Sequence, residues 1–340
     1  MITLTGDINL TDNDFDSGFG VGSQIKKGIN PFVDIPMKDT DIWIGNFEGV
    51  TAYVSKNSGV KRNAFRIEPQ YLKKLNNCNY YNVSNNHAMQ HGSEAYKEMI
   101  YNLESLDSKV FGDSIKKSQI FEHLGLHLSV TGFCLRKENF GEKPCYWYNP
   151  EVNEIKEEVD SLKECDFKIA YIHWGCEYID RPYNEQVKFA HLLIDLGFDL
   201  IVGLHPHLLQ GYEDYKGKRI YYSIGNFVFN KEWEPFRYGA LVHVNIEKDK
   251  PIITHSYVRI DNSFPKIIDE NYVPTQYRFS YLNSLIKFNE SYEEYAKLCI
   301  SKYKEYRKIN RKQIIKGFVR MKPSDSFSII LDFVKRKLNR

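Results

Sequence analysis

Short apolar runs alternate with amphipathic segments along most of the chain. Runs typical of β-strands occupy residues 2–5, 41–44, 80–83, 108–111, 127–133, 167–172, 199–203, 219–224, 240–246 and 252–260. Apolar residues at helical spacing predict helices over Ser93–Leu106, with Ser93 as N-cap, and over Tyr183–Leu196, with Gly197 as C-cap. Pro69 near the start of Glu68–Asn77 favours a further helix there. Strands that alternate with helices predict an α/β fold.

The later part of the chain departs from this alternation. The runs at 219–224, 240–246 and 252–260 have no helical segment between them, so we expect a strand meander and a mixed core. After about Pro265 strand signals give way to helical spacing, and Pro323 divides this region. We therefore expect one domain over residues 1–265 and a mainly helical, basic extension over residues 266–340.

Charge is distributed unevenly along the 340 residues. Lys297–Arg340 contains 14 basic and 3 acidic residues, a net +11, so the rest of the chain carries about −9 against a total of +2. The last segment, Ser326–Leu338, has apolar residues on one face. Two explanations stay open for this basic extension: peripheral contact with an anionic membrane surface, or docking on the core or on a second subunit. Nucleic-acid binding is not expected, because the body is acidic and no nucleic-acid motif is present.

The six cysteines and the N-terminus bear on the compartment. The cysteines are irregularly spaced and form no C-x-x-C pair, which is typical of free thiols in a reducing compartment. The first residues form a strand-like run without signal-peptide features, and no apolar run reaches the length of a membrane span. We expect a cytoplasmic protein, with the inner membrane face as the site of any peripheral contact.

Five polar motifs each follow one of the strand-like runs. They are Gly6-Asp7, Asn46-Phe47-Glu48, Ser84-Asn85-Asn86-His87, His173-Trp174-Gly175 and Gly203-Leu204-His205-Pro206-His207. Because ligands bind beyond the carboxyl ends of strands in open α/β sheets, the shared placement predicts one pocket. Each motif alone also has a structural explanation, such as a turn or a hydrogen-bonded core histidine. Their carboxylate, amide and imidazole groups together favour a divalent metal site.

Six side chains of these motifs are candidate metal ligands: Asp7, Glu48, Asn86, His173, His205 and His207. Such a set can hold two ions about 3.5–4 Å apart, as in two-metal hydrolases. We expect one or two ions, with Mn, Zn, Fe and Mg as candidates. In an extended backbone, His205 and His207 would point the same way, with Pro206 stiffening the turn. His87, beside Asn86, is the candidate general acid.

The motifs also resemble a known family. GDINL, NFEG, SNNHAMQHG, HWGCEY, GLHPHLLQGYE and YYSIGNFVF, in this order over about residues 2–229, are similar to the bacterial CapA family, which is related to the calcineurin-like metallophosphoesterases. The resemblance implies a four-layer α/β/β/α sandwich of metallophosphoesterase type, the six ligands above, and His87 assisting the leaving group. It adds four candidate substrate-binding residues: Arg66, Glu177, Gln210 and Asn226.

The function implied by this resemblance is a metal-dependent hydrolase of phosphoesterase type, linked to capsule, poly-γ-glutamate or surface polysaccharide metabolism. Its substrate would be a phosphoester or an anionic polymer. The alternative is a non-catalytic accessory protein of capsule or poly-γ-glutamate assembly, with capsule-synthesis proteins as partners. One departure is Asn9, where related enzymes have the histidine of a D-x-H motif. A centre with fewer nitrogen ligands is expected to bind its first ion less tightly, or to prefer a harder ion such as Mn²⁺ or Mg²⁺.

Overall fold

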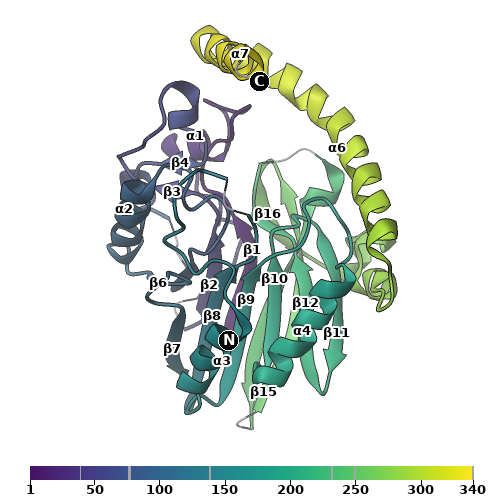
Figure 1. Ribbon diagram of the computed structural model, residues 1–340. Coiled ribbons are helices and arrows are strands. Elements are labelled where there is room, and N and C mark those ends of the chain that lie inside the picture. Colours follow the sequence, from purple (N-terminus) through teal and green to yellow (C-terminus); the bar gives the residue numbers. More distant parts are fainter. Residues whose placement is uncertain (39, 76–77, 138, 231–232, 249, 339–340) are drawn as a thin grey trace.

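Two β-sheets stacked face to face form the centre of the protein (Figure 1). The computed structural model describes residues 1–38, 40–75, 78–137, 139–230, 233–248 and 250–338. The eight-stranded sheet has the order β16-β15-β14-β1-β2-β5-β6, with β13 beside β1, and the six-stranded sheet has the order β11-β12-β10-β9-β8-β7. Parallel pairing of β1, β2, β5 and β6, and of β8, β9 and β10, aligns the carboxyl ends of these strands.

The strands have the following bounds. The first sheet consists of β1 (Ile2–Ile8), β2 (Ile42–Phe47), β5 (Tyr80–Asn82), β6 (Lys109–Phe111), β13 (Asn226–Val228), β14 (Tyr238–Glu247), β15 (Lys250–Asp261) and β16 (Phe264–Ile268). The second consists of β7 (Ser118–His123), β8 (Leu126–Cys134), β9 (Phe167–His173), β10 (Leu200–Leu204), β11 (Leu209–Tyr215) and β12 (Lys218–Ile224). A separate two-stranded sheet pairs β3 (Val50–Thr51) with β4 (Arg66–Ile67).

Apolar clusters fill the spaces between the layers. Leu4 and Ile44 of the first sheet share one buried cluster with Val130 and Ile169 of the second. A second cluster joins the outer face of the first sheet to α1 (Val21–Lys26) and α2 (Ser93–Glu104). A third joins the outer face of the second sheet to α3 (Val152–Ser161) and α4 (Asn184–Leu196). The expected four-layer α/β/β/α sandwich is therefore confirmed.

All ten expected strands are present with adjusted ends, but six strands were missed: β3, β4, β7, β11, β13 and β16. Of these, β7, β11 and β16 lie at sheet edges, where their solvent-facing residues interrupt the apolar pattern. The expected three-strand meander is wrong, because β12 belongs to the second sheet and β14 and β15 to the first. The chain changes sheets after β12 at Gly225, whose φ of 67° favours glycine.

The helix predictions had mixed outcomes. Helix α4 ends at Gly197, whose φ of 118° is left-handed as expected for a C-cap. Helix α2 begins after Gly92, so Ser93 as N-cap is wrong; the Ser93 N–H instead donates to Glu142 Oε2 over 2.9 Å. The helix expected over Glu68–Asn77 is replaced by the 3₁₀ turn η2 (Pro69–Tyr71) and further turns to Leu75, while residues 76–77 lie outside the described residues.

The reason lies in the packing of this segment. Among its described residues only Pro69 and Leu72 are fully buried. A short helix gains most of its stability from an apolar face packed against the core, and two buried side chains provide little of that.

The C-terminal part is helical, apart from short 3₁₀ turns. These elements are η4 (Glu270–Tyr272), η5 (Thr275–Tyr277), α5 (Phe279–Leu282), η6 (Asn283–Leu285), α6 (Tyr292–Arg320) and α7 (Pro323–Leu338). A capping box formed by Ser291 and Glu294 starts α6, and Pro323 starts α7, so the proline separates two helices as predicted. Strand β16 spans residue 265, where the domain boundary was expected. The division into two domains stays a prediction.

Figure 1 shows α6 curving from the side of the sandwich to its upper end, where α7 lies above the α1 side. Helix α7 contacts η1 (Gly59–Arg62), and Ser17 Oγ donates to Asp325 Oδ2 over 3.3 Å. Within the described ranges, no helix combines the length and apolar character that a membrane crossing requires.

Candidate metal centre

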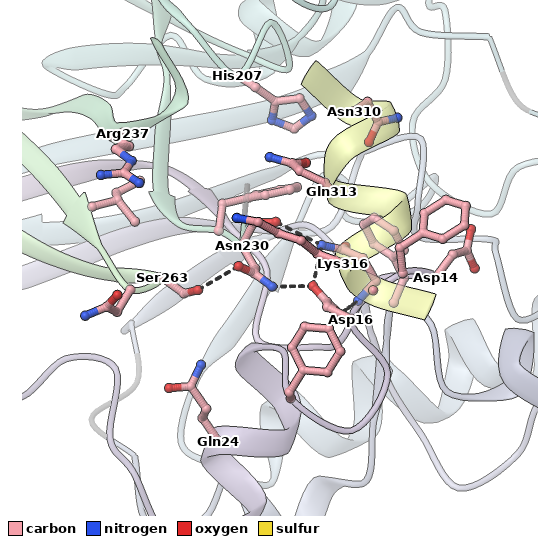
Figure 2. A pocket seen from close by; sticks show the side chains of 18 of the residues that line it. Asp14, Asp16, Gln24, His207, Asn230, Arg237, Ser263, Asn310, Gln313 and Lys316 are labelled. Atoms are coloured by element: carbon pink, nitrogen blue, oxygen red, sulfur yellow. Dashed lines mark hydrogen bonds between the residues drawn. The ribbon is translucent and has the colours of Figure 1, made fainter. Parts of the chain in front are cut away.

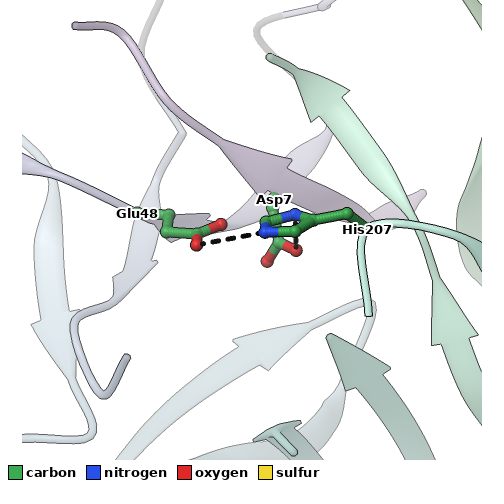
Figure 3. A group of neighbouring side chains, drawn as sticks. All are labelled: Asp7, Glu48 and His207. Carbon is green, nitrogen blue, oxygen red and sulfur yellow. Dashed lines mark ion pairs between the residues drawn. The ribbon is translucent and has the colours of Figure 1, made fainter. Parts of the chain in front are cut away.

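Asp7, Glu48 and His207 form one compact group of buried side chains (Figure 3). Asp7 lies in β1, Glu48 directly follows β2, and His207 lies in the loop after β10. His207 Nδ1 is 3.4 Å from Asp7 Oδ2, and its Nε2 is 3.7 Å from Glu48 Oε1. One ligand atom from each residue lies within 4.8 Å of the others, a spacing that a single ion can bridge.

Asn86, His173 and His205 form a second group beside the first. His173 Nε2 is 2.8 Å from Asn86 Oδ1 and 3.0 Å from His205 Nδ1. Asp7 links the groups, because its Oδ1 is 3.8 Å from His173 Nδ1 and its Oδ2 accepts the His205 N–H over 3.1 Å. The structure thus brings all six predicted ligands together as two adjacent triplets, an arrangement that suits one or two divalent ions.

A chain of buried amides orients Asp7. Asn46 Nδ2 donates to Asp7 Oδ1 over 2.8 Å, and Asn82 Nδ2 donates to Asn46 Oδ1 over 3.0 Å. Both asparagines lie on strands whose carboxyl ends meet at this edge, and both are fully buried. Neither asparagine is among the site residues that the sequence predicts. The available signal was an asparagine within each of two buried parallel strands, where an unpaired amide would be costly.

The backbone conformation of the His205-Pro206-His207 segment differs from the predicted one. His205 has a φ of 92° and His207 a φ of 60°, so both adopt left-handed backbone and not the extended conformation. Their ring centroids are 5.9 Å apart. Each imidazole therefore joins a different triplet. His207 is held by Asn226, whose Oδ1 lies 2.9 Å from His207 Nδ1.

Burial sets the protonation states that metal binding requires. Burial lowers the pKa of His173 to about 3 and lowers that of His205 well below its ordinary value, so both imidazoles are neutral at pH 7. Burial alone would raise the pKa of Asp7, but interactions with His207, His173 and Asn46 outweigh it and lower this pKa. Neutral imidazoles and an ionised carboxylate are the forms that bind metal. In the described part of the chain the buried His205 Nε2 has no hydrogen-bond partner, which leaves this nitrogen available to an ion.

His87 lies at the opening of the site. Its Nε2 is 3.8 Å from Glu48 Oε1, and its Nδ1 is 2.7 Å from Gln90 Oε1. Its ring stacks on Phe65 with centroids 3.8 Å apart and planes 3° apart. The side chain keeps 18% of its surface exposed, whereas Glu48 is fully buried. His87 is thus fixed in orientation with one edge toward the cavity.

The site opens into a cavity of about 790 Å³. His87 and His207 line it at the metal centre, and one face of α6 forms a wall (Figure 2). Among the four predicted substrate-binding residues, Glu177 lines this cavity, while Asn226 supports His207 from behind.

The structure does not bring the other two, Arg66 and Gln210, to the cavity wall. The Arg66 guanidinium donates to the backbone carbonyls of Arg62 and Ala52, and Gln210 Nε2 donates to the Ile179 carbonyl over 2.9 Å. The Asn9 side chain makes its hydrogen bonds within its own loop: Oδ1 accepts the Thr11 N–H over 2.9 Å, and Nδ2 donates to Asn13 Oδ1 over 3.2 Å.

The chain is similar in sequence to known proteins. Residues 1–231 match the family model described as bacterial capsule synthesis protein PGA_cap. The chain is 30% identical over 238 residues to the PGA biosynthesis protein CapA of Bacillus subtilis, covering 64% of this chain and 61% of that protein. It is 27% identical over 274 residues to the capsule biosynthesis protein CapA of Bacillus anthracis, covering 72% of this chain and 63% of that protein. The matched part thus spans about three fifths of the length of these relatives.

Among solved structures, a putative 5'-nucleotidase from Staphylococcus aureus in complex with alpha-ketoglutarate aligns with a TM-score of 0.48 and 11% identity, covering 84% of this chain and 57% of that one. The 5'-nucleotidase of Candida albicans aligns with a TM-score of 0.47 and 15% identity, covering 90% and 58%. The family match runs from β1 through β13 and includes every predicted ligand. The chain therefore belongs to the bacterial capsule synthesis protein family PGA_cap.

Proposed function

We propose that this protein is a metal-dependent hydrolase of phosphoesterase type that acts in capsule, poly-γ-glutamate or surface polysaccharide metabolism. The observation that carries the proposal is the pair of ligand triplets, Asp7, Glu48 and His207 beside Asn86, His173 and His205. One of these ligands, His207, lines a cavity of about 790 Å³. The names of the Bacillus relatives supply the link to capsule and PGA biosynthesis.

The residues divide the chemistry between them. Divalent ions held by the two triplets would supply Lewis-acid stabilisation of the phosphoryl oxygens and an activated water. His87 acts on the leaving group. With its Nδ1–H donated to Gln90 Oε1, the protonated imidazole presents Nε2–H at the cavity, where it can protonate the departing oxygen. Glu48 Oε1 lies 3.8 Å from this nitrogen, and Phe65 holds the ring plane.

Metal analysis combined with turnover tests the proposal. We expect purified protein to contain one or two equivalents of a divalent metal and to hydrolyse 4-nitrophenyl phosphate or bis(4-nitrophenyl) phosphate. A chelator should abolish this activity, and Mn²⁺ should restore it. His207→Ala should lose both metal and activity. His87→Ala should keep its metal and lower kcat by about 10²–10⁴. Metal-replete protein without turnover of phosphomonoesters or phosphodiesters would refute the proposal.

The second candidate is a non-catalytic accessory role in polymer assembly. A probable polyglutamine synthesis accessory protein of Mycobacterium tuberculosis is 37% identical to this chain over 98 residues, covering 27% of this chain and 26% of that protein. On α7, moreover, four large apolar residues stay exposed: Phe327, Ile330, Leu331 and Val334. Such a face beside basic residues suits an anionic membrane or a partner synthase.

Removal of residues 324–340 tests this role. In the accessory role, the full chain floats with vesicles of anionic lipid, or co-purifies with capsule-synthesis proteins, and the truncated chain does neither. Equal behaviour of the two chains, together with metal-dependent turnover, would exclude it in favour of the hydrolase.

A further inference from the structure

Helix α6 forms one wall of the cavity that borders the metal centre at His207. Six of its residues line this cavity: Tyr306, Asn310, Gln313, Lys316, Gly317 and Arg320. Their spacing of three and four residues places them on one face of the helix. The helix lies outside residues 1–231, the part matched by the family model. The shape and charge of this wall are therefore not given by the family match.

Contacts at both ends of the cavity hold α6 in place. At one end, the Tyr306 ring stacks on Tyr178, and Lys302 Nζ is 3.3 Å from Asp180 Oδ2. At the other end, Gly317 allows a close approach to the loop after β1, because a Cβ at this position would lie 2.3 Å from the Phe15 carbonyl oxygen. The α6 wall is thus a packed part of the fold.

Beyond the metal centre, basic groups dominate the cavity. Four basic side chains line it: Lys27, Arg237, Lys316 and Arg320. The acidic ones are Asp14, Asp16 and Glu177. Burial and the neighbouring charge of Asp12 raise the pKa of Asp16 to about 8, so Asp16 is mostly neutral at pH 7. The basic groups therefore outnumber the ionised acidic ones by four to two.

Two polar side chains on the cavity wall could donate hydrogen bonds to a ligand. Gln313 Nε2 is buried and has no hydrogen-bond partner among the residues that the structure describes. An unpaired buried donor is costly, and a ligand oxygen would satisfy it. Arg237, from the segment before β14, supplies a planar guanidinium suited to a carboxylate or phosphate (Figure 2).

The cavity also limits the size of the ligand. Its 790 Å³ falls within the roughly 300–1,000 Å³ of small-molecule sites. Because α6 closes one side, the site suits a compact molecule or a chain end better than the middle of a long polymer.

We propose that this cavity selects a compact phosphoester with a second anionic group, the phosphoryl group lying at the metal centre and the second anion bound by Arg237 and the α6 side chains Gln313 and Lys316. This inference rests on the proposed function and names its substrate class.

A matched pair of non-hydrolysable ligands tests binding without turnover. Phenylphosphonate and 4-phosphonobenzoate differ only in one carboxylate, and calorimetry in the presence of Mn²⁺ gives the affinity of each. We expect the wild-type protein to bind 4-phosphonobenzoate at least about tenfold more tightly, as for one charge-assisted hydrogen bond. Arg237→Gln and Lys316→Gln should reduce this preference, because each weakens the binding of 4-phosphonobenzoate more than that of phenylphosphonate. The control is Arg311→Gln, on the exposed side of α6, which should keep the wild-type preference for 4-phosphonobenzoate.

The outcomes separate this inference from the proposed function. Equal wild-type affinities, or a preference that survives both cavity substitutions, would overturn the inference even if the protein hydrolyses aryl phosphates. A preference that these substitutions abolish would support the second-anion site even if no substrate is turned over. In an active protein, the ratio of kcat/KM for 4-carboxyphenyl phosphate to that for phenyl phosphate should fall in the same variants.

Discussion

Tyr306 of α6 stacks on Tyr178 with ring centroids 4.0 Å apart and planes 20° apart. Tyr178 follows Glu177, a residue of the cavity wall, and has a left-handed φ of 71°. Trp233 and Phe236 enclose the same Tyr306 ring, at centroid distances of 5.7 and 5.9 Å. The position of α6 is thus coupled to the loop that follows His173.

Loss of this aromatic contact should loosen α6. Tyr306→Ala removes a stacked pair worth about 0.5–1.5 kcal/mol beyond its buried area. We expect faster amide hydrogen exchange across residues 303–320 and little change in the central strands. Tyr306→Phe keeps the ring and should behave nearly as wild type. Unchanged exchange in the alanine variant would show that other contacts hold the helix.

Arg66 should matter for stability and not for ligand binding. Its guanidinium donates to the carbonyls of Arg62 and Ala52 and to the side chains of Asn63 and Glu68. Arg66→Ala would leave the buried Ala52 carbonyl without this donor, at a cost of about 1–3 kcal/mol in the free energy of unfolding, which urea denaturation measures.

Arg66→Lys should rescue little of that loss, because a lysine cannot reproduce the planar array of donors. The opposite result, normal stability with weakened binding of phenylphosphonate, would return Arg66 to the substrate site.

The ligand set could be predicted from sequence because it depends on a rule of position. Parallel strands end at a common edge, so Asp7 and Glu48 had to converge once β1 and β2 paired in parallel. His173 ends β9 of the other sheet and reaches Asp7 because the two sheets stack face to face. The conformation at His205 and His207 could not be predicted in this way. Left-handed backbone at two non-glycine residues depends on the surroundings that hold it, and no local propensity indicates it.

Long-range packing explains the other differences. The spacing of apolar residues predicts helices in the C-terminal region, but not which face of α6 meets the cavity, since that depends on partners as distant as Phe15 and Tyr178. Arg66 lies in the family's motifs, yet its hydrogen bonds to a nearby loop become evident only in the folded chain. A motif thus marks an important residue without distinguishing a structural role from a binding role.

His243 should make stability depend on pH below 6.5. Burial, assisted by His255, lowers the pKa of His243 to about 4 from an ordinary value of 6.5. As pH falls below 6.5 the unfolded chain takes up this proton first, so the free energy of unfolding should decrease down to about pH 4 and then level off for this group. The loss is about 3 kcal/mol.

His243→Gln isolates this contribution, since an amide can still bond with Thr3 and Ser256, the hydrogen-bond partners of the imidazole. Urea denaturation between pH 4 and pH 7 should show a smaller acid loss in the variant. Parallel curves for the two proteins would mean that His243 titrates alike in the folded and unfolded chains.

Cys176 should be the most reactive thiol at neutral pH. It lies in the loop after β9, where a hydrogen bond from Cys299 of α6, opposed by burial and assisted by the charge of Arg136, lowers its pKa to about 6. The buried Cys78 has its pKa raised to about 12. Because the thiolate is the nucleophile, the rate at which iodoacetamide alkylates Cys176 should increase with pH, with a midpoint near pH 6. Peptide mass spectrometry measures this rate.

Cys299→Ala removes the hydrogen-bond donor and should move this midpoint toward the ordinary thiol value of about 8.5. Cys78→Ala, at a buried thiol that the contact does not involve, should leave it in place. A wild-type midpoint near 8.5 would mean that Cys176 and Cys299 are not in contact in solution. Because Cys299 belongs to α6, that result would also place the helix farther from the loop after β9, and the cavity would lose the wall that narrows it to a compact ligand.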